Sequence, residues 1–277
     1  MAIAGDLHGS WLQEDNDLLM HLNPDGVLFV GDLGDADLKL VKLISSLPIP
    51  TAVILGNHDR GKDLDGSKLK AQISLLANKN CAWDKSNWNN PLVSVVGARP
   101  CSAGGGYYLS PQMKAVFGHV SLDESVRRIV KAASDVPKDL PLIILAHSGP
   151  TGLGSDVTSP CGRDWKTPSV DWGDKDLELS IDQIRKSRDV DLVVFGHMHH
   201  QLKRGKGQRK TCHVDNLRDT VYLNTACVPR RGRDANGVEL CHFSWVEFSK
   251  GKLINASHRW FRNDHSLAFK DTVYSRF

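Results

Sequence analysis

Short runs of apolar residues bounded by turn residues recur along most of this chain, and they restrict its fold more than any other feature. Runs of this length are typical of buried β-strands. They lie at residues 27–30, 52–55, 92–96, 142–146 and 192–195. Amphipathic segments typical of helices lie at 12–22, 38–46, 67–76, 122–133 and 177–188. This alternation predicts an α/β layered fold.

The pattern changes after residue 195. Strands are predicted at 221–224, 238–248 and 253–260, with a hairpin turn at 249–252, so we expect a second, more antiparallel sheet. Because no internal repeat or low-complexity linker interrupts the sequence, we expect a single domain over residues 1–277, with about 262–277 as a loosely attached tail.

Two long loops, 98–111 and 149–176, are rich in glycine, proline and serine. Loops of this length in a compact domain are usually functional or disordered. Asp164 and Trp165 in the second loop are candidates for a lid over a site, although the sequence does not decide whether either loop forms one.

Composition narrows the class of protein without naming a partner. The chain has 277 residues, 40% of them hydrophobic, and a formal charge of +3, which alone suggests neither a nucleic-acid nor a membrane partner. No apolar run approaches the roughly 20 residues of a membrane span. The six cysteines form no CxxC pair, which favours free thiols in a reducing compartment. We therefore expect a soluble protein of the cytoplasm, or of the plastid stroma if a transit peptide has been removed.

Five predicted strands end in a turn residue followed by side chains able to bind a metal ion. These side chains are Asp6 and His8, Asp32 and Asp35, Asn57 with His58 and Asp59, His147, and His197 with His199. Each motif by itself is weak evidence for a metal site. The carboxyl ends of parallel strands, however, share one edge of a sheet, so these side chains should converge there. Oxygen and imidazole ligands without thiolate indicate a catalytic centre for manganese, iron or zinc, with magnesium as a further option. Asp32, with two carboxylate oxygens, is able to bridge two ions.

The pattern DxH, GDxxD, GNHD, H and GHxH, from Asp6 to His199, resembles the calcineurin-like metallophosphoesterase superfamily. The resemblance implies a two-sheet β-sandwich flanked by helices (αββα). It also implies two divalent or trivalent metal ions, one on Asp6, His8, Asp32 and His199 and the second on Asp32, Asn57, His147 and His197. His58 would contact the substrate phosphate, and Asp59 would orient His58.

The implied reaction is hydrolysis of a phosphate ester by in-line attack of a metal-bridging hydroxide. His58 would give a proton or hydrogen bond to the leaving oxygen. Protein Ser/Thr phosphatases have Arg-Gly after GDxxD and Glu after GNH, whereas this chain has Ala36-Asp37 and Asp59 there. It therefore resembles the branch that acts on small molecules, and the stretches 99–100 and 149–152 resemble a group found in cyanobacteria and plant plastids. Asp35 is then expected to support a ligand or to cap a helix.

The favoured function is a phosphomonoesterase acting on a small phosphorylated metabolite, with a phosphodiesterase or nucleotide pyrophosphatase as the alternative. A catalytically silent scaffold is disfavoured because every expected ligand is present. A nuclease would depend on the basic segment 203–210, which lacks interleaved aromatic residues. Arg60 and Arg99 are the candidate substrate-binding cations. The sequence determines neither the oligomeric state nor the physiological metals.

Overall fold

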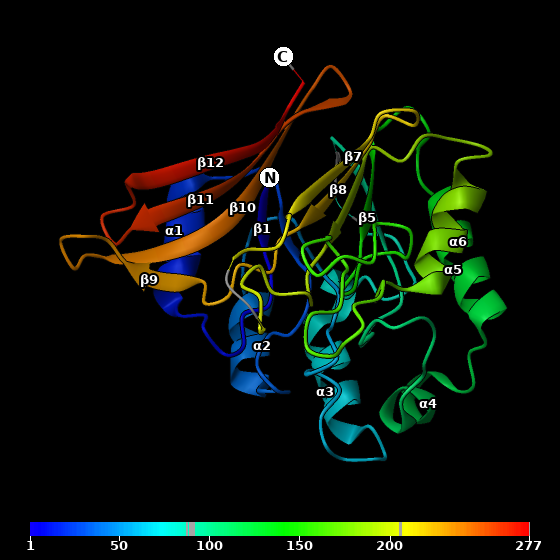
Figure 1. The fold of residues 1–277 in the computed structure, drawn as a ribbon. Coiled ribbons are helices and arrows are strands. Elements are labelled where there is room, and N and C mark those ends of the chain that lie inside the picture. The colour runs from blue at the N-terminus through cyan, green and yellow to red at the C-terminus, as the bar shows by residue number, and fades with distance from the viewer. Residues whose placement is uncertain (87, 89–91, 205–206, 277) are drawn as a thin grey trace.

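Two mixed β-sheets pack against each other in a computed structural model that describes residues 1–86, 88, 92–204 and 207–276 (Figure 1). The first sheet has the order β12-β11-β10-β1-β2-β3, and β9 pairs with β10. Its strands are β1 (Ala2–Ala4), β2 (Val27–Phe29), β3 (Thr51–Val53), β9 (Arg231–Arg233), β10 (Glu239–Ser249), β11 (Lys252–Arg262) and β12 (Leu267–Ser275).

The second sheet has the order β4-β5-β6-β8-β7. Its strands are β4 (Ser94–Gly97), β5 (Leu142–Leu145), β6 (Leu192–Phe195), β7 (Cys212–Asp215) and β8 (Thr220–Asn224). The helices are α1 (Gln13–Leu22), α2 (Leu38–Ser45), α3 (Ser67–Leu76), α4 (Pro111–Phe117), α5 (Leu122–Ser134) and α6 (Lys175–Ile184), with a 3₁₀ turn at Ala77–Lys79. The helices flank the two sheets, so the expected αββα arrangement is confirmed (Figure 1).

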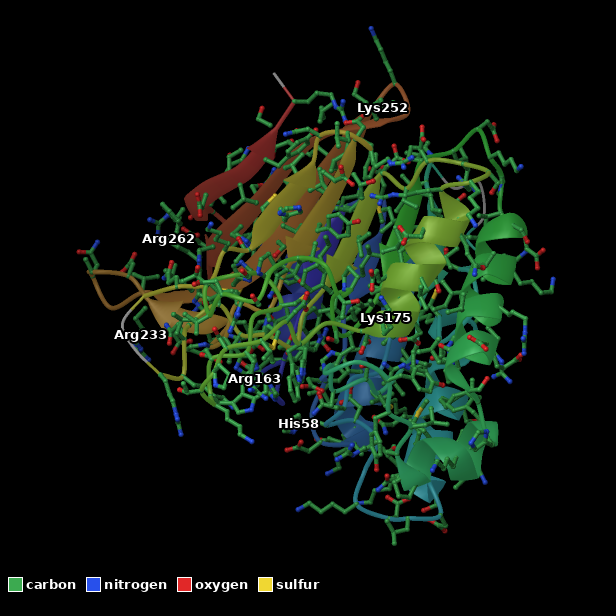
Figure 2. The ribbon with its side chains drawn as sticks, turned by 45° about the vertical axis from the view of Figure 1, so that its right-hand side comes forward. His58, Arg163, Lys175, Arg233, Lys252 and Arg262 are labelled. Carbon is green, nitrogen blue, oxygen red and sulfur yellow. The ribbon has the colours of Figure 1, made fainter. Side chains whose placement is uncertain are left out.

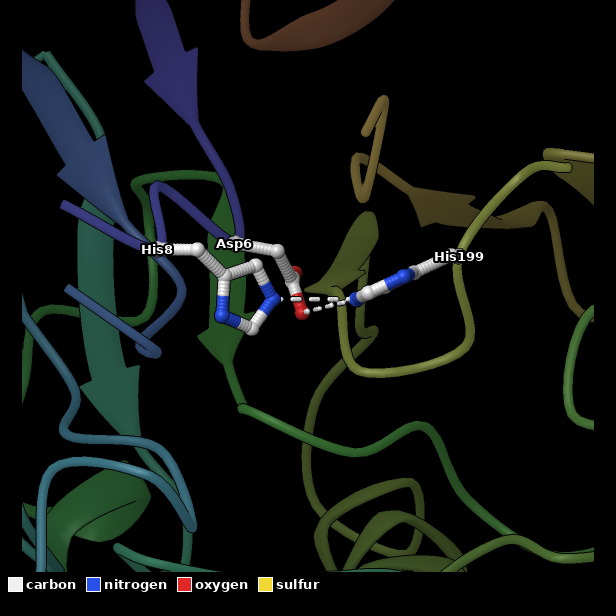
Figure 3. A group of neighbouring side chains, drawn as sticks. All are labelled: Asp6, His8 and His199. Carbon is white, nitrogen blue, oxygen red and sulfur yellow. Dashed lines mark hydrogen bonds and ion pairs between the residues drawn. The ribbon is translucent and has the colours of Figure 1, made fainter. Parts of the chain in front are cut away.

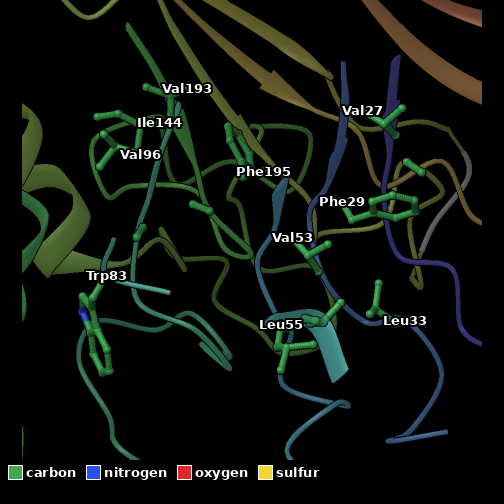
Figure 4. Packing of buried hydrophobic residues seen from close by; sticks show 14 of the residues in the cluster. Val27, Phe29, Leu33, Val53, Leu55, Trp83, Val96, Ile144, Val193 and Phe195 are labelled. Carbon is green, nitrogen blue, oxygen red and sulfur yellow. The ribbon is translucent and has the colours of Figure 1, made fainter. Parts of the chain in front are cut away.

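Alternate side chains of the central strands enter two separate hydrophobic layers, as the period of two in a β-strand requires. Ile3, Leu28 and Val194 lie in the layer between the sheets. Phe29 and Val193 belong to the larger cluster, which also contains buried residues of the helices (Figure 4). Because these strands are covered on both faces, they appear in the sequence as continuous apolar runs.

Parallel pairing brings the ends of the central strands into line. Ala4 pairs with Phe29, and Phe29 pairs with Val53, so the segments after β1, β2 and β3 leave the first sheet at the same edge. In the second sheet, the Gly196 amide after β6 donates to the carbonyl of His147 after β5 at 2.8 Å. The strand register therefore gathers the residues that follow these strands into one region.

The structure differs from the sequence-based expectations mainly at the C-terminus. The prediction of a loosely attached tail is wrong for residues 267–275, because these form β12, which pairs antiparallel with β11. Most residues of β12 are exposed and many are polar, and for this reason the sequence suggested a tail. Strands β7 and β9 and helix α4 were also not predicted.

Among the described residues, none of the helices combines the length and apolar character that crossing a membrane requires.

Candidate metal centre

One group of potential metal ligands consists of Asp6 and His8, which follow β1, and His199, which follows β6 (Figure 3). The Nε2 atoms of His8 and His199 lie 3.1 Å apart, and Nε2 of His199 lies 3.7 Å from Oδ1 of Asp6. Two imidazole nitrogens and a carboxylate oxygen thus face one small volume. Ligands bound to one ion at about 2.0–2.2 Å are separated by distances of this size.

A second group consists of Asp32 after β2, His147 after β5 and His197 after β6. Nε2 of His147 lies 3.4 Å from Oδ1 of Asp32 and 3.0 Å from Oδ1 of Asn57. The other ring nitrogen of His147, Nδ1, donates to the Val30 carbonyl at 2.7 Å. That bond places the proton on Nδ1 and leaves the Nε2 lone pair directed at the group, as in many histidines that bind metals.

The backbone at these groups adopts an unusual conformation. Asp6, His8, Asp32 and His197 have φ angles of 47°, 45°, 50° and 64°, in the left-handed region that residues with a Cβ seldom adopt. Such a conformation costs on the order of 1–3 kcal/mol per residue and persists where the surrounding structure enforces it. Hydrogen bonds to the carboxylates help to enforce it, because the His197 amide donates to both oxygens of Asp6 at 3.0 Å and the His58 amide donates to Asp32 at 2.9 Å.

Two glycines allow the segments to approach one another closely. A Cβ at Gly31 would lie 2.5 Å from the Gly56 nitrogen and 2.8 Å from Nδ1 of His147, and Gly31 has a φ of +95°. A Cβ at Gly56 would collide with Oδ1 of Asp32. Glycine at these two positions therefore permits the close approach of the segments.

Charge at the site is concentrated and largely shielded from water. Burial, reinforced by the charge of Asp32, raises the pKa of Asp6 well above its usual value. Burial lowers the pKa of His197 to about 3 and that of His199 to about 4, and neighbouring histidines contribute to both shifts. These imidazoles are therefore neutral near pH 7, which is the form that binds a metal ion.

The donor set fits two divalent cations. Crowded buried carboxylates repel one another unless a positive charge lies between them, and the neutral imidazoles supply the remaining lone pairs. Each group brings at least three donor atoms within 4.8 Å of one another, in the combination of oxygen and nitrogen that suits manganese, iron or zinc. The assignment of individual residues as ligands, and of Asp32 as the bridge, stays a prediction.

His58, labelled in Figure 2, lies beside both groups, and its side chain is 50% exposed. Its Nδ1 lies 2.9 Å from Oδ1 of Asp35. A carboxylate only accepts, so Nδ1 carries a proton and Nε2 is free to act toward a ligand. The T-shaped contact between the rings of His8 and His58, with centroids 5.2 Å apart, keeps His58 next to the first group.

The prediction that Asp59 orients His58 is wrong. The Asp59 carboxylate is fully buried and accepts hydrogen bonds from the amides of Leu33, Gly34 and Gly56 at 2.8, 3.3 and 2.8 Å. It therefore joins the turns after β2 and β3, and Asp35 is the carboxylate that contacts His58. Asp35 had been expected to support a ligand or cap a helix, but Asp37 is the residue that caps α2.

The prediction that Arg99 binds substrate is also wrong. Arg99 is 2% exposed, and its guanidinium donates to Asp174 at 2.7 Å, to Asp176 at 2.9 Å and to the carbonyls of Gly106 and Tyr108. Arg99 therefore connects the two long loops and is closed to a ligand. Arg60 is partly buried, and within the described residues no hydrogen bond or ion pair joins its guanidinium to another group, so its role as a substrate-binding cation stays a prediction.

Both long loops line a cavity of about 480 Å³ that reaches the metal-ligand groups. Ala103 comes from the first loop, and Asp164, Trp165 and Trp172 come from the second. The lining also includes residues at or beside the metal-ligand groups, namely Asp32, Asn57, His58, His197, Met198 and His199. Gln201, Lys203 and Arg209 complete it. Sequence reasoning placed Trp165 here but missed Trp172 and Gln201, which follow no strand and match no motif.

Part of the basic segment 203–210 is structural. Arg209 is 4% exposed and donates to the carbonyls of Val157, Ser159 and Gly162 at 2.9, 2.8 and 2.5 Å. It therefore holds the second loop in place, and only a small part of its side chain reaches the cavity. Residues 205 and 206 of this segment lie outside the described residues.

The family model of the calcineurin-like phosphoesterases matches residues 1–201. No curated protein matches the chain.

Three solved structures share the fold at low sequence identity. TT1561 of Thermus thermophilus is 14% identical over 99% of this chain and 98% of its own, with a TM-score of 0.54. A dimetal phosphatase from Danio rerio is 11% identical over 99% and 98%, with a TM-score of 0.55. The purple acid phosphatase PPD1 of yellow lupin seeds is 16% identical over 98% of this chain and 52% of its own, with a TM-score of 0.52.

Proposed function

Because this chain belongs to the calcineurin-like phosphoesterase family, and is thus a metal-dependent phosphoester hydrolase, we propose that it is a phosphomonoesterase acting on a small phosphorylated metabolite. The observation that carries the proposal is the close approach of two ligand groups at one end of an open cavity, with the half-exposed His58 beside them. A phosphate in the cavity would meet both groups and His58 together.

We assign Asp6, His8, Asp32 and His199 to one metal ion and Asp32, Asn57, His147 and His197 to the second. When bound, two such ions supply Lewis acidity, which offsets the charge that develops on phosphoryl oxygens and makes a water more acidic. The Val30 carbonyl keeps the proton of His147 on Nδ1, and the His197 amide holds the carboxylate of Asp6. These contacts preserve the positions of the donor atoms before any ligand arrives.

His58 is the proposed proton donor to the leaving oxygen. The contact of its Nδ1 with Oδ1 of Asp35, at 2.9 Å, leaves Nε2 as the ring nitrogen that would carry the proton to be donated. That proton is directed away from Asp35 and is available to the oxygen that departs with the alcohol. Asp35 therefore positions His58, as expected for a general acid held by a carboxylate.

A phosphodiesterase is the alternative within the same chemistry. The proposed metal ligands would bind the phosphate of a monoester or of a diester. The two functions must therefore be distinguished by comparing the rates of hydrolysis of the two kinds of substrate. We expect the chain, reconstituted separately with manganese, iron, zinc and magnesium, to hydrolyse p-nitrophenyl phosphate faster than bis-p-nitrophenyl phosphate. A higher kcat/KM for the diester with every metal would refute the phosphomonoesterase proposal and leave the family chemistry intact.

A further inference from the structure

The cavity that reaches the metal-ligand groups is also lined by two tryptophans that the hydrolytic chemistry does not need. Trp165 and Trp172 meet edge to face, with ring centroids 5.3 Å apart. Both line the same cavity as His58, His197 and His199. A molecule whose phosphate lies at the metal centre would therefore extend along the wall that they form.

Trp172 is held rigidly. Its indole N–H donates to the Ala103 carbonyl at 2.9 Å, and the Arg163 guanidinium lies 5.1 Å from its ring centroid. A Cβ on Gly105 would come within 2.8 Å of the Trp172 ring, so glycine at this position lets the first loop lie against the indole. Trp172 thus forms a fixed support for the edge-to-face contact with Trp165.

The backbone before Trp165 is fixed by Asp164, whereas the Trp165 ring and its N–H remain available to a ligand. The Asp164 carboxylate lies 3.5 Å from Arg209 and accepts from the Lys203 amide at 2.5 Å, which fixes the chain just before Trp165. The Trp165 ring is only partly buried, and no hydrogen bond of its indole N–H is found within the described residues, whereas Trp11, Trp83 and Trp172 all have partners there. A partly buried ring at a cavity wall, with an N–H that has no partner among the described residues, is available to a ligand.

Lys203 adds positive charge to the same wall. Its ammonium lies 5.8 Å from the Trp165 ring centroid. In the part of the chain that the structure describes, no carboxylate forms an ion pair with this ammonium. The wall therefore combines a π surface, a free N–H donor and a positive charge beside the metal-ligand groups.

We propose that Trp165, supported by Trp172 and Lys203, binds a planar aromatic group in the part of the substrate that leaves with the ester oxygen. The inference deepens the proposed phosphomonoesterase function and rests on it for the position of the phosphate. The cavity, at about 480 Å³, lies within the range of about 300–1,000 Å³ of sites for small organic ligands. A nucleobase and a simple aryl ring share this chemistry, and matched substrates separate them.

The primary test is binding, because it does not depend on turnover. Calorimetry on the full chain loaded with manganese compares benzylphosphonate with butylphosphonate, neither of which can be hydrolysed as an ester. We expect the benzyl compound to bind about tenfold more tightly, as stacking on a tryptophan predicts. Trp165→Ala should remove this preference and leave butylphosphonate affinity within about twofold, whereas Trp165→Phe should keep most of it.

Trp260→Ala is the matched control. Trp260 is also partly buried, but it lines a separate hollow with His200 and Thr211. Its substitution should leave the preference for the benzyl compound unchanged. Equal affinity for the two phosphonates in the unmodified chain would overturn the inference, as would an equal weakening of both in Trp165→Ala.

Hydrolysis then identifies the kind of ring. Hydrolysis of AMP and of ribose 5-phosphate breaks the same primary phosphate ester bond, and the two substrates differ in the presence of the base. Benzyl phosphate and butyl phosphate form the corresponding pair without a sugar. A lower KM for AMP alone indicates a nucleobase, and a lower KM for both ring-bearing esters indicates any aryl group. If no ester is hydrolysed, the proposed function fails, yet the phosphonate affinities still decide whether the wall binds aromatic groups.

Discussion

Replacing Arg99 with methionine should destabilise the chain strongly, because Arg99 is the only partner whose charge offsets two buried carboxylates within the described residues. Its guanidinium contacts Asp174 at 2.7 Å and Asp176 at 2.9 Å, and both carboxylates are at most 4% exposed. Removing one member of a buried ion pair typically costs about 3–5 kcal/mol, since the remaining charge is left without compensation. We expect a loss in this range in the free energy of unfolding near pH 8.

The loss should shrink as the pH falls. Burial, opposed by Arg99, raises the pKa of Asp174 to about 7, above its ordinary value of 3.8. Without Arg99 this pKa must rise further, so the folded variant binds more protons than the folded parent around and above pH 7. Stability relative to the parent therefore decreases with rising pH and recovers as Asp174 becomes protonated.

Urea denaturation followed by tryptophan fluorescence at pH 5.5 and pH 8 measures both effects. Arg128→Met is a suitable control, because Arg128 is 36% exposed and pairs with Glu124 on the same helix, where an ion pair contributes less than about 1 kcal/mol. A loss below about 1 kcal/mol for Arg99→Met, or a loss that grows as the pH falls, would refute the reasoning.

Three further predictions concern the site. His58→Asn should lower kcat by about 10²–10⁴ while the metal content stays at two ions per chain, as steady-state kinetics and elemental analysis would measure; unchanged kcat would exclude a proton-donor role. Asp32→Asn should lower the bound metal and abolish hydrolysis, and full activity would contradict its bridging position. Gly56→Ala should reduce metal content and melting temperature because the new Cβ collides with Asp32, whereas Gly232→Ala, whose Cβ would have its nearest neighbour at 3.7 Å, should change neither. Equal behaviour of the two alanine variants would show that Gly56 is not needed for the close approach.

The sequence predicted the layered fold well because its signals are local. Strands β2, β5 and β6 are buried on both faces, so each appears as a continuous apolar run that a single window detects. Helix α5 carries its buried residues at a helical spacing, with Ser121 accepting from the Glu124 amide at its start. Strand β12 gives neither signal, because it is an edge strand with many exposed residues, and its place depends on pairing with β11.

The sequence by itself determined which side chains can bind metal ions and which strand each of them follows. Asp6, His8, Asp32, Asn57 and the later histidines stand at strand ends, and parallel strands must deliver such residues to one edge. This is why the potential ligands could be identified without coordinates.

Tertiary structure alone decided how charged side chains are partnered. Asp59 directly follows His58 in the sequence and Asp35 precedes it by 23 residues, yet Asp35 contacts the imidazole and Asp59 is buried under backbone amides. In the sequence, Arg99 resembles a substrate-binding cation. In the structure, it is paired with two carboxylates that lie more than seventy residues away along the chain. Such pairings depend on long-range distances and on access to water, which residue identity and spacing do not encode.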